Sequence, residues 1–217
     1  MLHGFPHLVD PLHYMRHAVL HAIAAHRPLS TSDSRPSFID RGGNPVKRLI
    51  DESDIRREVT NVGKKIAHDY RDSQLTILGV LTGSIVFVAD LIRAIDLPVR
   101  LGVIQASSYR GRTTQPAALT IDTHMLPDIR GRDVLIADDI FDTGRTLDAL
   151  VKDIRQQEPN SVGSVVLLRK QGRQTVEIEP DYHCFDIPDA FIVGYGLDYN
   201  DDYRHLPYIA VMEEQDL

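Results

Sequence analysis

Short, continuous apolar runs alternate with amphipathic segments along most of this chain, and no other feature constrains its fold as strongly. Four runs have the length of a buried strand: 75–81, 99–109, 134–140 and 161–170. Segments with apolar residues at helical spacing lie before or between these runs: 51–70, 84–95 and 145–157. This alternation is typical of a parallel sheet covered on both faces. It predicts an α/β fold, in which the shorter apolar runs 190–197 and 208–212 complete the sheet or build an attached subdomain.

The composition narrows the class of protein. The formal net charge is −7, which argues against a general nucleic-acid binder because such proteins neutralise phosphates with Lys and Arg. No apolar stretch approaches the roughly 18 residues that cross a bilayer, so no membrane partner is expected. The single cysteine, Cys184, cannot form an internal disulfide, and this favours a reducing, cytoplasmic location.

The N-terminal residues differ from the rest of the chain. Six of the ten histidines lie within the first 26 positions, and the regular α/β pattern begins only near residue 48. We therefore expect an N-terminal extension over 1–47, whose order the sequence leaves open, followed by one domain over 48–217. A second irregular segment lies between the second and third predicted strands, at 110–132. Loops of this length in compact domains are usually either functional lids or disordered, and of these two we expect a lid.

The third strand, in "VLIADDIFDTGRT", ends in an unusual concentration of carboxylates: Asp138, Asp139 and Asp142. One interpretation is a solvated turn in which Asp142 or Thr143 caps the next helix. The alternative is a ligand site, because loops after parallel strands commonly bind ligands. A helix N-terminus at 143–146 can bind phosphate through backbone amides, and the preceding carboxylates suit ribose hydroxyls or Mg2+. The ligand that combines these groups is 5-phosphoribosyl-1-diphosphate (PRPP).

This stretch resembles the PRPP-binding motif of type I phosphoribosyltransferases. Three further stretches, "LGVLTGSIVFVADLIRAI", "SSY" and "PDYHCFDIPDAFIVGYGLDYNDDYRHLPYIAVM", are similar to the hypoxanthine-guanine branch of that family. The resemblance covers about residues 49–212. It implies a central parallel sheet flanked by helices, a small hood subdomain, a long flexible loop opened by Ser108 and Tyr109, and assembly as a homodimer or homotetramer.

The activity that the resemblance implies is purine salvage. Such enzymes transfer the phosphoribosyl group of PRPP to N9 of hypoxanthine or guanine and give IMP or GMP plus diphosphate, with Mg2+ as cofactor. Two alternatives stay open at this point. One is a xanthine-preferring or broader 6-oxopurine phosphoribosyltransferase, and the other is a PRPP-binding regulator that binds RNA.

The resemblance also implies roles for individual residues in PRPP binding. Asp138 and Asp139 match the acidic pair at the ribose hydroxyls and, with Asp198, the carboxylates near the metal ions. Asp142 matches the catalytic acid or base at purine N7. The loop that binds the ribose phosphate then comprises Asp142, Thr143, Gly144, Arg145 and Thr146. The turn that binds diphosphate, which often contains a cis peptide, corresponds to Thr82 and Gly83, and Arg204 matches an arginine that contacts diphosphate.

The purine-binding residues follow from the same match. Lys170 corresponds to the lysine that hydrogen-bonds the 6-oxo group, Phe191 to the aromatic ring that stacks on the base, and Ile192 to a backbone contact with the base edge. Asp198 lies in the same segment. Three positions depart from the family's usual residues: Thr82 replaces a lysine, Asp138 replaces a glutamate, and Arg145 replaces a lysine. The first of these weakens the expected side-chain contact with diphosphate.

Overall fold

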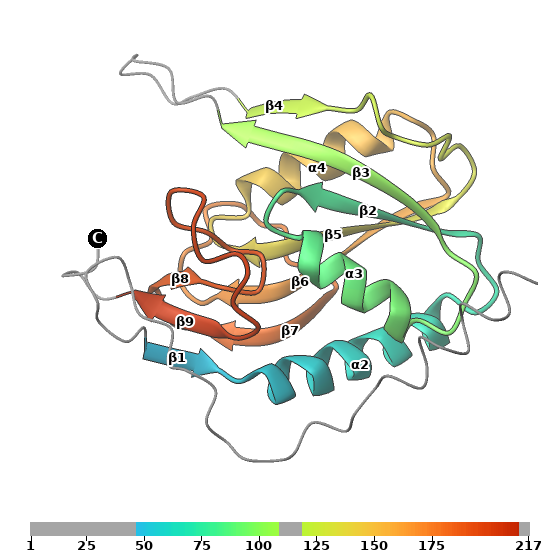
Figure 1. Cartoon of the computed structure of the whole chain (residues 1–217). Coiled ribbons are helices and arrows are strands. Elements are labelled where there is room, and N and C mark those ends of the chain that lie inside the picture. The colour runs from blue at the N-terminus through green and yellow to red at the C-terminus, as the bar shows by residue number, and fades with distance from the viewer. Residues whose placement is uncertain (1–46, 109–118, 213–217) are drawn as a thin grey trace, which may run out of the picture. The chain divides into compact units, whose positions relative to one another are not determined.

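The structure is a computed structural model that describes residues 47–108 and 119–212. Its strands are β1 (Lys47–Ile50), β2 (Leu75–Leu81), β3 (Arg100–Ser108), β4 (Leu119–Asp122), β5 (Asp133–Phe141), β6 (Ser161–Lys170), β7 (Tyr182–Ile187), β8 (Phe191–Val193) and β9 (Ile209–Met212). Its helices are α2 (Glu52–Asp69), α3 (Ile85–Ala94) and α4 (Arg145–Arg155) (Figure 1). Within this described part, no helix combines the length and apolarity needed to cross a membrane.

A six-stranded sheet forms the centre of the fold, in the order β4-β3-β2-β5-β6-β7 (Figure 1). All neighbouring strands in it are parallel except the β3–β4 pair. After β2 the chain adds β3 on one side, whereas after β5 it adds β6 on the other side. The loops that leave β2 and β5 therefore diverge, and ligands in open α/β sheets bind in the crevice at such a switch point.

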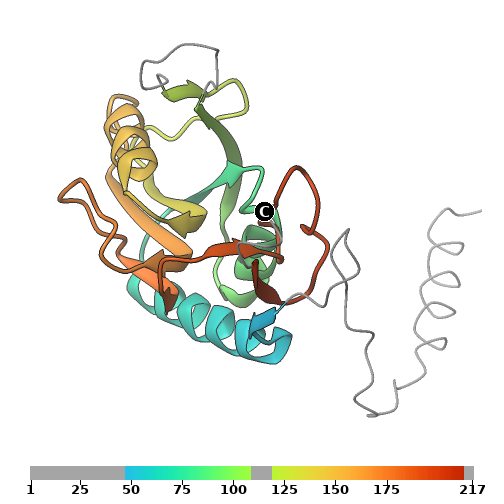
Figure 2. The same cartoon turned by 90° about the vertical axis from the view of Figure 1, so that its left-hand side faces the viewer.

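Helices cover both faces of this sheet, as the alternating pattern predicts. α2 and α3 pack on one face, where Ile66 and Phe87 join Ile77 and Leu135 in one apolar cluster. α4 covers the opposite face, where Leu150 packs in a second cluster with strand residues such as Leu78 and Ile136. Figure 2 shows the sheet between α4 and α2. Burial on both faces explains why the central strands read as continuous apolar runs rather than alternating ones.

A smaller antiparallel sheet, in the order β1-β9-β8, forms the attached subdomain. Its own apolar cluster includes Val193, Leu206 and Tyr208. The alternative in which 190–197 and 208–212 extend the central sheet is therefore wrong. Strand β8 is also shorter than the apolar run that predicts it, because Gly194, Tyr195 and Gly196 adopt positive φ angles of 98°, 50° and 103°. These angles end the strand and turn the chain.

Three strands were not expected from the sequence. β1 lies at the boundary of the proposed extension and pairs with β9, and β7 extends the main sheet beside β6. β4 falls inside the segment 110–132 that was interpreted as an irregular loop, and it pairs with β3 as an antiparallel edge strand. All three lie at sheet edges, where short strands need no long apolar run.

α2 and α3 approach each other closely at Gly63. A Cβ atom on Gly63 would lie 2.6 Å from Cβ of Ala94 and 2.9 Å from the Ala94 carbonyl carbon. Alanine normally stabilises a helix interior by about 0.5–1 kcal/mol relative to glycine. Here the contact with backbone atoms outweighs that gain, because the backbone of α3 cannot move without disturbing the core.

We expect Gly63→Ala to lower the melting temperature, measured by circular dichroism. The double variant Gly63→Ala/Ala94→Gly removes the nearest atom and should recover part of the loss, which a double-mutant cycle quantifies. A higher melting temperature for Gly63→Ala alone would contradict this account of the helix contact.

Candidate active site

The predicted site residues on β5 and in the loops after β2 and β5 meet at the switch point of the central sheet. Asp138 and Asp139 belong to the end of β5, and Thr82 and Gly83 follow β2 directly. Because β2 and β5 are parallel neighbours, their carboxyl ends lie side by side. Lys170 ends β6, the next strand along the same edge. The topology thus gathers residues that lie far apart in the sequence.

Asp138 and Asp139 form a buried acidic pair. Only 8% of Asp138 is exposed, and one of its carboxylate oxygens accepts a hydrogen bond of 2.9 Å from the backbone amide of Asp139. Burial and the neighbouring charge of Asp139 raise the pKa of Asp138 well above its ordinary value. Burial also raises the pKa of Asp139, while hydrogen bonds and the positive charge of Arg204 oppose that rise. A cation or a hydroxyl donor placed here would relieve both effects.

Gly83 lies directly against this pair. A Cβ atom on Gly83 would fall 1.7 Å from a carboxylate oxygen of Asp139, which no side chain can tolerate. On its other side, a Cβ atom on Gly196 of the attached subdomain would fall 2.2 Å from the Gly83 carbonyl oxygen. The peptide bond between Leu81 and Thr82 is cis, as the resemblance implied for this turn. At Gly83, backbone atoms can therefore approach a ligand with no side chain of that residue in the way.

The loop after β5 has the conformation expected of an anion-binding turn. Gly144 occupies the N-cap position of α4 with φ 80°, in the left-handed region that glycine adopts freely. Neither Asp142 nor Thr143 caps α4, since its N-cap makes no side-chain hydrogen bond; that interpretation is wrong. The first amides of α4 consequently lack intrahelical partners and are available to a phosphate.

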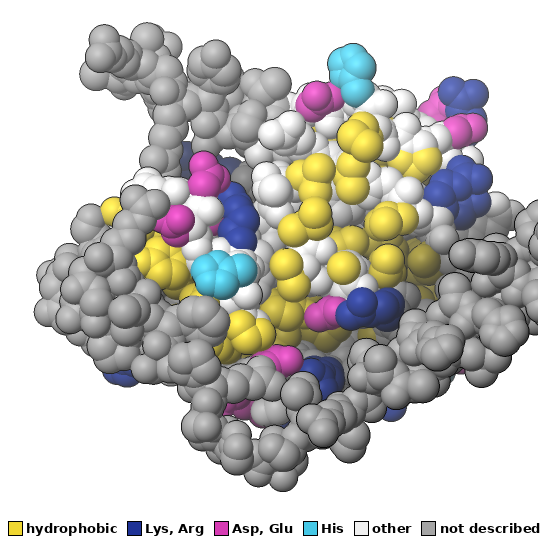
Figure 3. Space-filling view, viewed as in Figure 1, with side chains coloured by type: hydrophobic (Ala, Val, Ile, Leu, Met, Phe, Trp, Pro, Cys, Tyr) yellow, Lys and Arg dark blue, Asp and Glu magenta, His cyan; other side chains and the backbone are white. Residues whose placement is uncertain are grey.

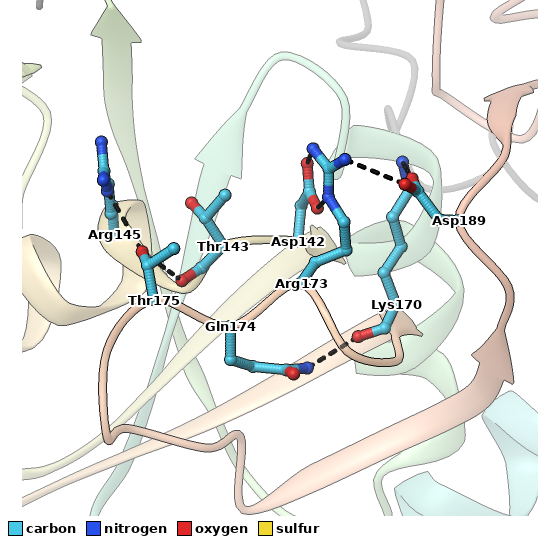
Figure 4. Close-up of polar contacts among 8 residues, drawn as sticks. All are labelled: Asp142, Thr143, Arg145, Lys170, Arg173, Gln174, Thr175 and Asp189. Atoms are coloured by element: carbon cyan, nitrogen blue, oxygen red, sulfur yellow. Dashed lines mark hydrogen bonds and ion pairs between the residues drawn. The ribbon is translucent and has the colours of Figure 1, made fainter.

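A segment after β6 folds over this loop and was not anticipated as part of the site. The amide of Thr175 donates to the Thr143 carbonyl at 3.0 Å, and Nε of Arg145 donates to the Thr175 hydroxyl at 3.2 Å (Figure 4). Arg173 in the same segment pairs with Asp142, with Nε 2.9 Å from a carboxylate oxygen. The sequence offered only a local concentration of basic residues in "LLRKQGR" as a signal.

The residues assigned to the purine lie between β6 and β8. The Lys170 side chain is only 12% exposed, and its Nζ lies 3.4 Å from Asp189. The Phe191 ring is 41% exposed and makes an edge-on contact with Tyr199, with ring centroids 5.3 Å apart. Ile192 is buried, so its backbone rather than its side chain is suited to contact a ligand. An aromatic face and a nearly buried ammonium group fit a planar base with an oxo substituent.

Asp198 and Arg204 pair with each other in the attached subdomain. Nη2 of Arg204 lies 2.8 Å from a carboxylate oxygen of Asp198, and Nη1 donates to the Gly196 carbonyl at 2.8 Å. Over residues 47–108 and 119–212, no group of three or more His, Cys, Asp or Glu side chains is arranged to hold a metal ion. The three carboxylates assigned to metal therefore do not form a preformed cage. Ser108 ends β3, and Tyr109 lies outside the described residues.

The buried acidic pair predicts a pH-dependent effect on stability. The folded-state pKa of Asp138 lies above its unfolded value, so ionisation of Asp138 destabilises the fold, and this cost grows as pH rises above the unfolded-state pKa. We expect the Asp138→Asn variant to gain more stability at about pH 8 than at about pH 5. Each gain of about 1 kcal/mol should raise the melting temperature by roughly 2–4 °C.

The exposed Asp72 supplies the control, since Asp72→Asn should shift the melting temperature little at either pH. Equal shifts for Asp138→Asn at both pH values would show that burial of Asp138 does not perturb its ionisation.

Comparisons with known proteins identify relatives over most of the chain. Residues 46–200 match the family model described as a phosphoribosyl transferase domain. The chain is similar to the hypoxanthine-guanine phosphoribosyltransferase of Streptococcus pneumoniae, with 40% identity over 79% of this chain and 96% of the relative. The protein of the same name from Dictyostelium discoideum is 41% identical over 77% and 95%. A solved hypoxanthine phosphoribosyltransferase from Trypanosoma cruzi superposes with a TM-score of 0.75 and 36% identity, over 84% of this chain and 96% of that one.

Proposed function

The chain belongs to the hypoxanthine-guanine branch of the type I phosphoribosyltransferase family, and on that premise we propose that it acts in purine salvage. It transfers the 5-phosphoribosyl group from PRPP to N9 of hypoxanthine or guanine and releases IMP or GMP with diphosphate. The observation that carries this proposal is the meeting of a buried acidic pair, a turn in which Gly83 lies directly against that pair, and a phosphate-type loop at one switch point.

The loop Asp142 to Thr146 binds the 5′-phosphate in this proposal. The N-terminal amides of α4 point their free N–H groups toward an anion, and the helix dipole favours negative charge there. Thr143 and Thr146 add hydroxyl donors. Arg145 contributes positive charge near the loop. The presence of arginine where some relatives have lysine should change phosphate binding little, because backbone amides make most of the contacts.

Asp138 and Asp139 hold the ribose hydroxyls. Displacement at the anomeric carbon develops positive charge on the ribose ring, and buried carboxylates nearby stabilise that charge more strongly than carboxylates in water would. Backbone amides at Thr82 and Gly83 bind the leaving diphosphate, with Arg204 as the nearby cation. Since Thr82 lacks the ammonium group of the family's usual lysine, the backbone and Arg204 carry this contact.

The base lies between the Phe191 ring and the end of β6. Lys170 donates to the 6-oxo group, whereas the 6-amino group of adenine would present a donor to a donor. Asp142 accepts or returns the proton at N7, and the Ile192 backbone contacts the base edge. Closure of the loop opened by Ser108 and Tyr109 would exclude water, which otherwise competes for the sugar.

Mg2+ is the proposed cofactor, and the carboxylates at the switch point fit it. This ion commonly takes one or two protein carboxylates and completes its shell with water and substrate phosphates. Asp138 and Asp139 are buried next to the turn proposed to bind diphosphate, and the pKa values of their carboxyls are raised. Asp198 would lie near a second ion. When bound, Mg2+ supplies positive charge to the leaving diphosphate.

Assembly as a homodimer or homotetramer is part of the proposal. Figure 3 shows hydrophobic side chains gathered on the face that α3 and β3 form. Ile85 of α3 is 51% exposed and Leu101 of β3 is 45% exposed. Apolar patches of this kind commonly mark protein interfaces. The lone Cys184 supports a cytoplasmic location as part of the same proposal. The predicted boundary between the extension over 1–47 and the domain over 48–217 falls inside β1, because Lys47 already pairs with Val211 of β9.

A spectrophotometric assay tests the activity directly. We expect magnesium-dependent turnover of hypoxanthine or guanine with PRPP, while adenine and uracil stay inert because Lys170 and Asp142 match a 6-oxopurine. If xanthine is turned over faster than hypoxanthine and guanine, the proposed preference for those two bases is wrong. Binding of PRPP without turnover of any base would move the assignment to a regulator and make RNA binding the next measurement.

Asp142 is the residue to test for proton transfer. We expect Asp142→Asn to lower kcat by about 10²–10⁴-fold, the usual contribution of a general acid or base. The KM for PRPP should change much less, because backbone amides of the loop bind the phosphate. Steady-state kinetics with both substrates varied separates these effects, and a near-normal kcat would remove Asp142 from the proton-transfer role.

A further inference from the structure

Two positive and two negative side chains form one ion-pair network at the base end of the site (Figure 4). The Arg173 guanidinium lies between two carboxylates. Its Nε and Nη2 contact the two carboxylate oxygens of Asp142 at 2.9 and 3.4 Å, and its Nη1 contacts Asp189 at 2.9 Å. Lys170 completes the network through its contact with the other Asp189 oxygen. Both oxygens of the proposed general base are therefore engaged by the chain itself.

The backbone on either side holds Arg173 in this position. Gln174 donates from its side-chain amide to the Lys170 carbonyl at 2.7 Å, and Thr175 is hydrogen-bonded to the Thr143 carbonyl through both its amide and its hydroxyl. The segment that carries Arg173 is thereby attached both to the end of β6 and to the proposed phosphate loop. The turn that carries Arg173 is thereby held beside Asp142.

We propose that Arg173 is a positioning residue that competes with the purine for Asp142 and shifts to Asp189 alone when the base binds. This inference rests on the proposed function, which places the base N7 at Asp142. Asp189 gives Arg173 a second carboxylate, so the guanidinium keeps one charged partner after it leaves the first. Lys170 also contacts Asp189, and its ammonium group then turns toward the 6-oxo group of the base.

The solvent exposure of the ion pair between Arg173 and Asp142 sets how much it can change the KM for hypoxanthine. Arg173 is 42% exposed and Asp142 is 36% exposed, and ion pairs this accessible to water change an equilibrium by about two- to fivefold. Such pairs weaken as salt increases. Hypoxanthine is uncharged at neutral pH, so its own binding has little direct dependence on salt. A salt-dependent KM for this neutral base would consequently report on an ion pair that must open.

The test measures KM for hypoxanthine at saturating PRPP and magnesium, at about 50 mM and about 0.5 M salt. In the unaltered protein we expect KM to fall about two- to fivefold in the higher salt. The Arg173→Gln variant should show the lower KM already at low salt and little further response. Arg173→Lys should be intermediate, because an ammonium group cannot contact both carboxylates through a planar fork.

Arg169 provides a matched control. It is also an arginine held between two carboxylates, Asp186 at 2.7 Å and Glu179 at 3.4 Å, and neither carboxylate is assigned to the proposed base site. Arg169→Gln should leave both KM and its salt response unchanged. A higher KM for Arg173→Gln would show that Arg173 assists the base, and an unchanged KM or a salt response that persists without Arg173 would equally overturn the competition.

The assay separates this inference from the proposed function. If the unaltered protein turns over neither hypoxanthine nor guanine, the proposed function fails and KM cannot be measured. If it turns over either base and KM for that base shows no dependence on salt, only the competition by Arg173 is refuted.

Discussion

The burial of two adjacent carboxylates at the end of β5 is the constraint on which the rest of the site depends. Asp138 and Asp139 repel each other and lose hydration, so their ionised forms are costly in the free protein. The fold sustains this cost because β5 lies at the centre of a sheet with an apolar cluster on each face. In the proposed function, the ribose hydroxyls and the cation that accompanies diphosphate are the groups that compensate this charge.

The two ends of the site therefore have opposite electrostatic arrangements. At the end of the site that holds Asp138 and Asp139, hydrogen bonds and the positive charge of Arg204 oppose the rise in the pKa of Asp139, but the pKa values of both carboxyls stay raised. At the base end, Asp142 and Asp189 are matched by Arg173 and Lys170 in direct contact. In the proposed function this difference matches the two ligands, because PRPP is strongly charged and binds with Mg2+, whereas the purine base is neutral.

The sequence predicted the central fold closely because buried parallel strands and their covering helices have strong periodic signals. The run 75–81 is strand β2 itself, and the carboxylate-rich end of the run 134–140 does lie at the switch point. Edge strands such as β4 and β7 carry too little apolar pattern to be found this way. The contact between Arg173 and Asp142 joins residues 31 positions apart through a turn, and no local periodicity encodes such a contact. The roles assigned to individual residues stay predictions.

The close stacking of Asp139, Gly83 and Gly196 brings the attached subdomain directly against the acidic pair. Two glycines let the subdomain backbone approach the diphosphate turn, and the turn approach the carboxylate, closer than any side chain would permit. Arg204 comes from that subdomain, and its hydrogen bond to the Gly196 carbonyl ties it to the stack. A side chain at Gly83 would collide with the Asp139 carboxylate, and a side chain at Gly196 would collide with the Gly83 carbonyl oxygen. The electrostatics of the site thus depend on two positions where the chain has no side-chain atoms.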